Sequence, residues 1–191
     1  MSTRPQAREN DVFMFRQFFR DHGIASVKAT SAYLVRRICR RIDRTRPRVI
    51  VELGPGPGCF TRVLLDRLSP DSRLVLIEAN PEFAAELGKV RDPRLRVIQG
   101  NAQNLREILA RAGVSEVDLV LSGIPFSFYP DVVKLRLLTD IRSVLAPDGV
   151  FVAYQATARL EKPLKRVFLR VRVEWQLFHI PPLVVFEARA A

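Results

Sequence analysis

The stretch VELGPGPGCF, residues 51–60, places three glycines at alternate positions directly behind an apolar run. That run, residues 49–53, has the continuous Val/Ile/Leu character of a strand that is buried on both faces. Residues 60–68 then place apolar side chains three and four apart, which is the helical period. A strand, a glycine-rich loop and a helix in this order form the joint at which an open α/β sheet holds a ligand. The stretch therefore predicts the class of fold and the position of a site.

The same alternation continues along the chain. Apolar runs recur at residues 74–77, 95–98, 117–121 and 150–154, and segments with helical spacing lie between them at 81–90, 102–112 and 131–145. Parallel strands need such crossover connections, so the pattern predicts a doubly wound α/β fold. After Pro163 two β-rich stretches, 167–178 and 183–188, are separated by Pro181-Pro182. Because no helix fits between them, we expect the last strand to run antiparallel to its neighbour.

Two joints carry their own local signals. Asn80-Pro81 predicts a helix start, with the asparagine as N-cap and the proline at the first helical position. Residues 146–149, Ala-Pro-Asp-Gly, predict a turn before the fifth strand.

Length and composition limit the class of protein. A chain of 191 residues is enough for one ordinary domain. It has no run of the ~18 to 20 apolar residues that spans a bilayer and no secretory pattern at its start, so we expect a cytosolic protein. Cys39 and Cys59 form no CxxC pair, and His22 and His179 are far apart. We therefore expect no disulfide framework and no metal site.

The formal net charge of +11 is distributed unevenly. Residues 1–48 have 12 Lys and Arg against 4 Asp and Glu, residues 49–150 have 12 against 13, and residues 151–191 have 7 against 3. A near-neutral middle between basic ends favours a ligand-binding body with an anion-seeking surface, whether the anion is RNA phosphate or a lipid headgroup. The alternative is compositional, since a GC-rich genome by itself favours arginine.

The spacing of the glycines distinguishes a dinucleotide-binding loop from a loop that binds another cofactor. The dinucleotide fingerprint G-x-G-x-x-G needs its third glycine at position 59, where this chain has Cys59. The spacing E-x-G-x-G-x-G instead resembles the first motif of class I S-adenosylmethionine-dependent methyltransferases. The resemblance implies S-adenosylmethionine as cofactor, with the bare backbone against its methionine part. Glu52 would serve the cofactor's ammonium group through water.

The ends of the next two predicted strands extend this resemblance. Glu78 follows Gly58 by 20 residues, where a carboxylate accepts both ribose hydroxyls. Asn101-Ala102 stands where the family has an Asp-Ala-like pair at the adenine edge, and the asparagine amide still offers a donor and an acceptor. The cofactor site implied by the resemblance consists of Glu52, Gly54, Pro55, Gly56, Gly58, Glu78, Ala79, Asn101, Ala102 and Ser122. The implied fold is Rossmann-like, with a mostly parallel seven-stranded sheet, an antiparallel last strand and extra N-terminal helices.

The segment expected to contact the methyl acceptor is LSGIPFSFYP, residues 121–130, at the end of the fourth predicted strand. Base-modifying amino methyltransferases have an Asn or Asp here, followed by an aromatic ring that stacks on the base. In this chain Ser122-Gly123 replaces the Asn, and Phe126 stands where the stacking ring would be. Gly123-Ile124-Pro125 with Pro130 resembles a motif of the bacterial phospholipid N-methyltransferases, a family related to the rRNA adenine dimethylases. The resemblance extends over residues 13–186 and departs from the family after the fifth strand.

The N-terminal region adds an argument of its own. Residues 12–20, VFMFRQFFR, predict a short aromatic and basic helix of the kind that lies in a membrane interface. The alternative is a helix packed on the domain. A second predicted helix follows, with an apolar stripe and a crowd of arginines that can bind phosphate. The residues expected to contact substrate or membrane are Phe15, Arg16, Phe18, Phe19, Arg20, Arg36, Arg40 and Phe126.

These observations lead to one hypothesis with named alternatives. We expect a basic, aromatic extension over residues 1–48 and a methyltransferase domain over 49–191, peripherally bound to the inner face of the membrane. The substrate expected from the resemblance is the amine of phosphatidylethanolamine or its methylated derivatives. An rRNA adenine N6-methyltransferase, a methyltransferase of a small soluble amine and a non-catalytic binding protein are the alternatives. The candidates for handling the proton of the amine are Ser122, Tyr129, Tyr154 and Gln155.

Overall fold

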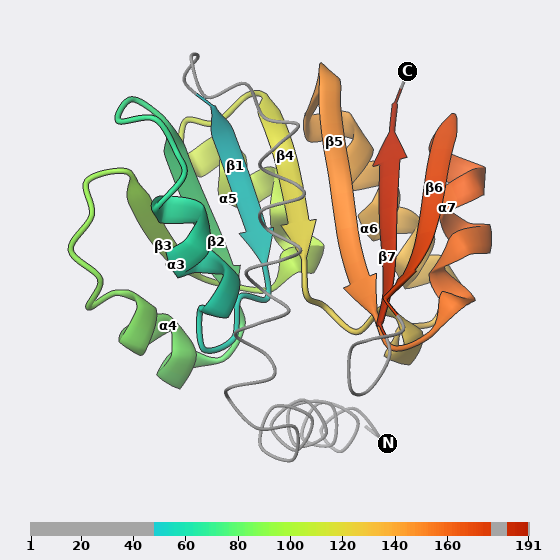
Figure 1. The fold of residues 1–191 in the computed structure, drawn as a ribbon, viewed down its shortest axis with the longest axis horizontal. Helices are drawn as coiled ribbons and strands as arrows, with labels where there is room; N and C mark the ends of the chain where they lie inside the picture. Colours follow the sequence, from blue (N-terminus) through green and yellow to red (C-terminus); the bar gives the residue numbers. More distant parts are fainter. Residues whose placement is uncertain (1–47, 177–182, 191) are drawn as a thin grey trace, which may run out of the picture.

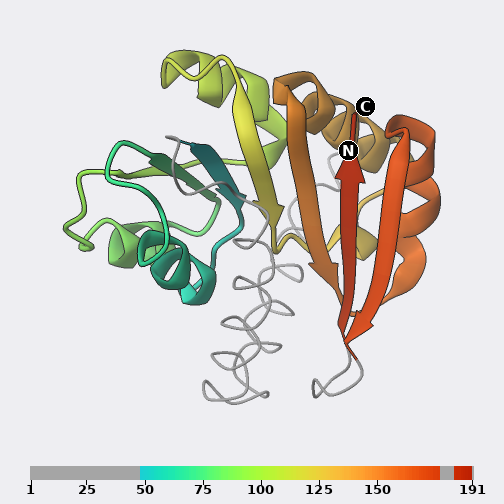
Figure 2. The same ribbon diagram turned by 45° about the horizontal axis from the view of Figure 1, so that its top comes forward.

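The computed structural model describes residues 48–176 and 183–190. Within these residues the strands form one seven-stranded sheet in the order β3-β2-β1-β4-β5-β7-β6, with helices on both of its faces (Figures 1 and 2). The strands are β1 (Val49–Leu53), β2 (Arg73–Glu78), β3 (Leu95–Gln99), β4 (Val117–Ser122), β5 (Leu145–Gln155), β6 (Arg170–Gln176) and β7 (Leu183–Arg189). The helices are α3 (Cys59–Leu65), α4 (Pro81–Leu87), α5 (Leu105–Arg111), α6 (Asp131–Val144) and α7 (Glu161–Val167), with 3₁₀ turns η1 (Ala102–Asn104), η2 (Phe126–Phe128) and η3 (Ala158–Leu160).

The strand directions confirm the predicted doubly wound fold. β1 pairs in parallel with β2 and β4, and β5 continues the parallel set beside β4. β7 runs antiparallel to both β5 and β6. The antiparallel last strand expected from the missing crossover helix is therefore confirmed.

Two cores lie on opposite faces of the sheet, because successive side chains of a strand point to opposite sides. On one face Val51 and Leu53 pack with the buried residues of α5, α6 and α7. On the other face Ile50 packs with the buried residues of α3 and with Leu87 of α4. The continuous apolar character of β1 is explained by this double burial.

The helix starts follow the local signals. The Asn80 side chain accepts hydrogen bonds from the backbone N–H groups of Glu82 and Phe83, and Pro81 is the first residue of α4. The predicted helix over 102–112 is divided into η1 and α5. Asn101 caps η1 by accepting a hydrogen bond from the Gln103 N–H, and a second helix start follows at Leu105.

The predicted turn at residues 146–149 lies within β5 rather than before it. Val117 of β4 pairs with Leu145, whereas Leu119 pairs with Val150, so four residues of β5 stand opposite Asp118 alone. A Cβ on Gly149 would lie 2.8 Å from the Ala146 carbonyl oxygen, which shows how tightly this bulge is folded. The bulge is at the amino end of the parallel strands, away from the glycine-rich loop.

Candidate active site

The glycine-rich loop leaves β1 at the carboxyl edge of the sheet. Gly54, Gly56 and Gly58 all have positive φ values, of 65°, 56° and 78°. Side chains with a Cβ rarely adopt this conformation, so the loop needs glycine for its own backbone as well as for close approach of a ligand. At Gly58 a Cβ would also lie 2.5 Å from the Leu87 side chain of α4. Gly58 serves as the N-cap of α3, so the loop passes directly into that helix.

Glu78, at the end of β2, holds the glycine-rich loop by hydrogen bonding to its backbone. One of its carboxylate oxygens accepts a 2.9 Å hydrogen bond from the Gly56 N–H, and the other accepts a 2.8 Å bond from the Asn80 N–H. The residue is only 6% exposed, and burial raises the pKa of its carboxyl group while the backbone hydrogen bonds lower it. Each carboxylate oxygen keeps a second lone pair. Glu78 can therefore bind a ligand and shape the loop at the same time.

Glu52 is a fully buried carboxylate next to the loop. Its Oε2 accepts a 2.7 Å hydrogen bond from the Thr61 hydroxyl of α3. Its Oε1 is buried and has no hydrogen-bond partner among the described residues. Burial raises the pKa of Glu52 to about 7, the bond from Thr61 lowers it, and the charge of Glu78 raises it further. A buried carboxylate with a bare oxygen is a site that a cationic group or a water would satisfy.

The end of β3 contributes a third polar group to the same edge. Asn101 is partly exposed, and its side-chain oxygen caps η1 through the Gln103 N–H. Its side-chain nitrogen takes no part in this cap. Ala102, the next residue, is buried at 6% exposure in the core that packs against α5. Asn101 and Ala102, the predicted adenine-edge pair, thus follow β3 and lie at its carboxyl end.

The end of β4 shows why this chain has glycine at position 123. A Cβ on Gly123 would lie 2.3 Å from the Tyr154 hydroxyl oxygen and 3.0 Å from the Gly54 carbonyl oxygen. The phenol of Tyr154 therefore occupies the space that a side chain at position 123 would enter. The Tyr154 ring is stacked on Phe60 of α3, with centroids 4.6 Å apart and planes at 18°. An aromatic pair and a bare backbone replace the amide that amino methyltransferases carry here.

Tyr154 stays protonated at neutral pH. Burial raises the pKa of its phenol well above the ordinary 10.0, and the charges of Glu52, Cys59 and Glu78 raise it further. A neutral phenol offers one O–H donor and an acceptor lone pair. It can orient an incoming amine by hydrogen bonding, but it is not a phenolate base.

Ser122 and Gln155 hold the loop after β4. The fully buried Ser122 accepts a hydrogen bond from the Ile124 N–H at 3.3 Å. The Gln155 side chain donates to the Ile124 carbonyl at 2.8 Å and accepts from the Phe126 N–H at 3.1 Å. Through these contacts Ser122 and Gln155, both predicted candidates for handling the proton of the amine, position the loop.

Phe126 does not fit its expected stacking role. Its ring is 1% exposed and lies edge-on to Phe151 and Tyr129, at centroid distances of 6.2 and 6.4 Å. Its backbone N–H donates to the Gln155 side chain, a contact that spans 29 residues and has no signal in the local sequence. Tyr129 packs against the same core. The exposed ring of this loop is Phe128, at 48%.

Several expected contacts lie outside the described residues. These are Phe15, Arg16, Phe18, Phe19, Arg20, Arg36 and Arg40. In the ranges 48–176 and 183–190, no helix combines the length and apolar character needed to cross a bilayer. The same ranges contain no cluster of three His, Cys, Asp or Glu residues that could hold a metal ion.

The residues at this edge fit S-adenosylmethionine. The Oε1 atom of Glu52 is buried without a hydrogen-bond partner among the described residues, so a cationic group would stabilise it. The amino-acid end of the cofactor carries such a group, an ammonium. The loop backbone has no side chains at three positions, and Glu78 keeps acceptor capacity for hydroxyl groups. These features come from the ends of β1 and β2, which are adjacent in the sheet.

Comparison with known proteins gives the same class. Residues 50–149 match a family described as a methyltransferase domain. The chain is 37% identical over 145 residues to an ornithine lipid N-methyltransferase from Singulisphaera acidiphila, covering 74% of this chain and 76% of that protein. It is 31% identical over 117 residues to ribosomal RNA small subunit methyltransferase A from Caulobacter vibrioides, covering 60% of this chain and 41% of the relative.

A solved structure supports the fold. The CurJ carbon methyltransferase superposes with a TM-score of 0.67 at 16% identity, over 95% of this chain and 59% of that one. The chain therefore spans less than two thirds of this structure and of the ribosomal RNA relative. The chain belongs to the S-adenosylmethionine-dependent methyltransferases, and its sheet is that of the class I members.

Proposed function

We propose that this methyltransferase methylates the amine of a membrane lipid headgroup, with ornithine lipid and phosphatidylethanolamine as the two acceptors to compare. The similarity to an ornithine lipid N-methyltransferase over three quarters of both chains supports the acceptor class. The single structural observation that carries it is the close approach of the Tyr154 hydroxyl to Gly123. This arrangement leaves no room at position 123 for an asparagine side chain, whose amide would hold the planar amine of a nucleobase. It instead offers the Tyr154 phenol to the tetrahedral amine of a lipid headgroup.

The cofactor would be held by the carboxyl ends of the first three strands. Glu52 would meet the ammonium group through water, Glu78 the ribose hydroxyls, and Asn101 with Ala102 the adenine edge. The backbone of residues 54–58 would line the methionine part, with Pro55 in the loop, and Ala79 and Ser122 would complete the walls. Bound in this way, S-adenosylmethionine supplies a methyl group on a positively charged sulfur.

The protein's own task is then to orient the acceptor and exclude water. The residues at the ends of β4 and β5 would hold the amine with its lone pair toward the methyl group that the cofactor supplies, and the proton that the amine loses would pass to water. Orientation of this kind contributes up to ~7 to 11 kcal/mol in well-aligned systems, so a strong base is not required. The Tyr154 hydroxyl accepts an N–H of the neutral amine and directs its lone pair.

An rRNA adenine methyltransferase is the second candidate. Similarity to the Caulobacter vibrioides ribosomal RNA relative favours it, together with the basic charge of the chain ends. Against it stands the geometry at Gly123, where an asparagine would collide with Tyr154 and with the Gly54 carbonyl. Methylation of a soluble amine is a third outcome that the same experiment resolves.

The test is a labelled-methyl assay with four acceptors side by side: vesicles containing ornithine lipid, vesicles containing phosphatidylethanolamine, ribosomal RNA and soluble amines. We expect label in one or both lipids and none in RNA. Label in RNA or in soluble amines alone would contradict the proposal.

A variant pair ties the assay to the site. Tyr154→Phe keeps the ring stacked on Phe60 and removes only the hydroxyl. We expect kcat with lipid to fall roughly 5- to 30-fold, as loss of one hydrogen bond of about 1 to 2 kcal/mol predicts. Binding of S-adenosylhomocysteine, measured by calorimetry, should be nearly unchanged. Tyr129→Phe is the matched control, and a larger loss there would reject the assignment to Tyr154.

A further inference from the structure

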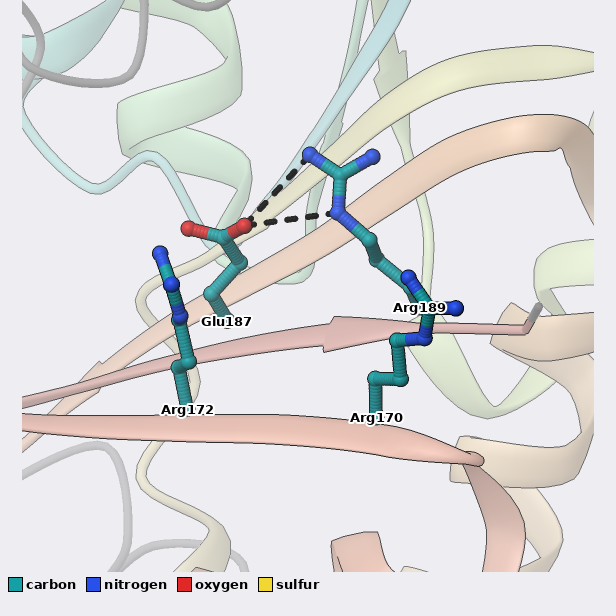
Figure 3. Close-up of a pocket in the computed structure, with 4 residues that line it drawn as sticks. All are labelled: Arg170, Arg172, Glu187 and Arg189. Atoms are coloured by element: carbon teal, nitrogen blue, oxygen red, sulfur yellow. Dashed lines mark hydrogen bonds and ion pairs between the residues drawn. The ribbon is translucent and has the colours of Figure 1, made fainter.

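An open pocket of about 400 Å³ lies on the β6–β7 ribbon (Figure 3). Its lining residues are Arg170, Arg172, Glu187 and Arg189. Gln155, at the carboxyl end of β5, pairs with Val184 of β7, whereas Arg189 pairs with Val150. Arg189 therefore lies five residues along β7 from the sheet edge that holds the glycine-rich loop. At ~3.3 Å per residue that is about 17 Å. The pocket is therefore separate from the cofactor loop.

The four side chains share one face of the sheet. Val184, Phe186 and Ala188 of β7 pack into the core under α6 and α7. Strand side chains alternate, so Glu187 and Arg189 point to the opposite face. Arg172 pairs with Glu187 and Arg170 with Arg189, which places all four on that face, as Figure 3 shows.

The pocket has more positive charge than its one carboxylate neutralises. Arg170 and Arg189 stand directly opposite each other across the antiparallel pair, an arrangement that costs stability when both are charged. The Glu187 carboxylate accepts two long hydrogen bonds, each of 3.4 Å, from two nitrogens of Arg189. Arg170 and Arg172 are exposed and form no ion pair within the described residues. Three arginines against one glutamate leave a net charge of +2.

We infer that this pocket is a second ligand site, which binds a phosphate group between Arg170, Arg172 and Arg189. Guanidinium groups bind phosphate oxygens in pairs, and a doubly charged phosphate would relieve the repulsion between Arg170 and Arg189. The phosphate belongs to a free phosphate compound or to a lipid headgroup. Charged residues on an edge strand also discourage pairing with other sheets, and β6 is such a strand. Edge protection alone predicts no ligand.

The test uses the full chain saturated with S-adenosylhomocysteine, so that the glycine loop is occupied. Calorimetry at low salt measures the binding of pyrophosphate, and flotation measures binding to phosphatidylglycerol vesicles. The variant is Arg170→Gln with Arg189→Gln, and the control is Arg136→Gln, an exposed arginine on α6. We expect the double variant to weaken pyrophosphate binding by about tenfold or more, as loss of charge-assisted bonds predicts, and the control to leave it unchanged.

The two assays distinguish the source of the phosphate. Loss of both pyrophosphate and vesicle binding supports a lipid headgroup, and loss of pyrophosphate binding alone supports a free phosphate compound. Failure of wild type to bind pyrophosphate, or full affinity in the double variant, would overturn the inference. Binding of an RNA oligonucleotide that the variant loses, without binding of pyrophosphate or vesicles, would replace it with a nucleic-acid surface. If the double variant does not fold, Arg172→Gln takes its place. None of these readouts depends on methyl transfer.

Discussion

Glu52 is a buried carboxylate that lowers the stability of the folded protein at neutral pH. It is fully buried, one of its oxygens has no hydrogen-bond partner among the described residues, and the pKa of its carboxyl is raised to about 7. Between pH 4.5 and about 7 the folded protein therefore holds a proton that the unfolded chain has lost. Stability must fall as pH rises through this window, because the folded state binds more protons there.

We predict that Glu52→Gln stabilises the protein above pH 7. The amide keeps an acceptor for the Thr61 hydroxyl and removes the buried charge. The gain at pH 8 should approach about 3 kcal/mol, the equivalent of the shift from 4.5 to about 7, and should vanish near pH 4. Urea unfolding at several pH values measures it. Equal pH profiles for variant and wild type would show that Glu52 is not the responsible group.

The same substitution should weaken S-adenosylmethionine binding. The cofactor's ammonium favours the ionised carboxylate, so wild-type affinity should rise between pH 6 and pH 8. In Glu52→Gln this rise should disappear, as titration calorimetry at the two pH values would show.

At the scale of elements, the site depends on how the end of β5 supports the loop after β4. Gln155 satisfies two backbone groups of that loop, the Ile124 carbonyl and the Phe126 N–H. Tyr154, the preceding residue, points to the opposite face and reaches Gly123. Adjacent residues of one strand thus hold the loop and line the proposed acceptor side.

We predict that Gln155→Met destabilises the protein by about 2 kcal/mol or more, because it leaves buried backbone groups unpaired. The loss of kcat should exceed the loss of cofactor affinity, since the loop at residues 123–126 lies on the acceptor side. Urea unfolding and steady-state kinetics provide the two readouts. Gln99→Met, at an exposed position of β3, is the control and should change neither. Unaltered stability in Gln155→Met would contradict the role given to these bonds.

The elements also show what the sequence could predict. The Asn80 cap, the glycine loop and the antiparallel β7 follow from residues close together in the chain, and each is confirmed. The burial of Phe126 and the contact of Tyr154 with Gly123 depend on residues about 30 positions apart. Their pairing is set by the packing of β4 on β5, which local patterns do not specify. The bulge in β5 has no local signal for a related reason: β5 begins before the turn-like sequence, and its pairing with β4 resumes at Val150 only because Leu119 lies opposite.

At the scale of the whole molecule, the two ends of the strands carry different groups. The carboxyl edge gathers Glu52, Glu78 and Tyr154, whereas the arginine pocket lies toward the amino edge of the β6–β7 ribbon. The basic charge of residues 151–191 is thus partly concentrated at one place.

We predict that S-adenosylhomocysteine raises the melting temperature of the whole domain. At a concentration of 100 times Kd it adds about 2.7 kcal/mol, and a domain of this size should melt about 5 to 11 °C higher. Differential scanning fluorimetry measures the shift. Glu78→Gln, which loses a buried acceptor beside Gly56, should show a smaller shift relative to its own melting point. No shift in the wild type would contradict the assignment of the cofactor site.

The bulge at residues 146–149 can accept additional residues, because none of its four residues pairs with β4. Pairing of β4 with β5 restarts at Leu119 and Val150, so residues added at the exposed Pro147 or Asp148 would extend outward without changing the direction of Tyr154. The segment lies at the end of the sheet opposite the glycine-rich loop. An epitope or fluorophore inserted there would report on the enzyme while leaving its chemistry untouched, and it marks a point where natural insertions would be tolerated.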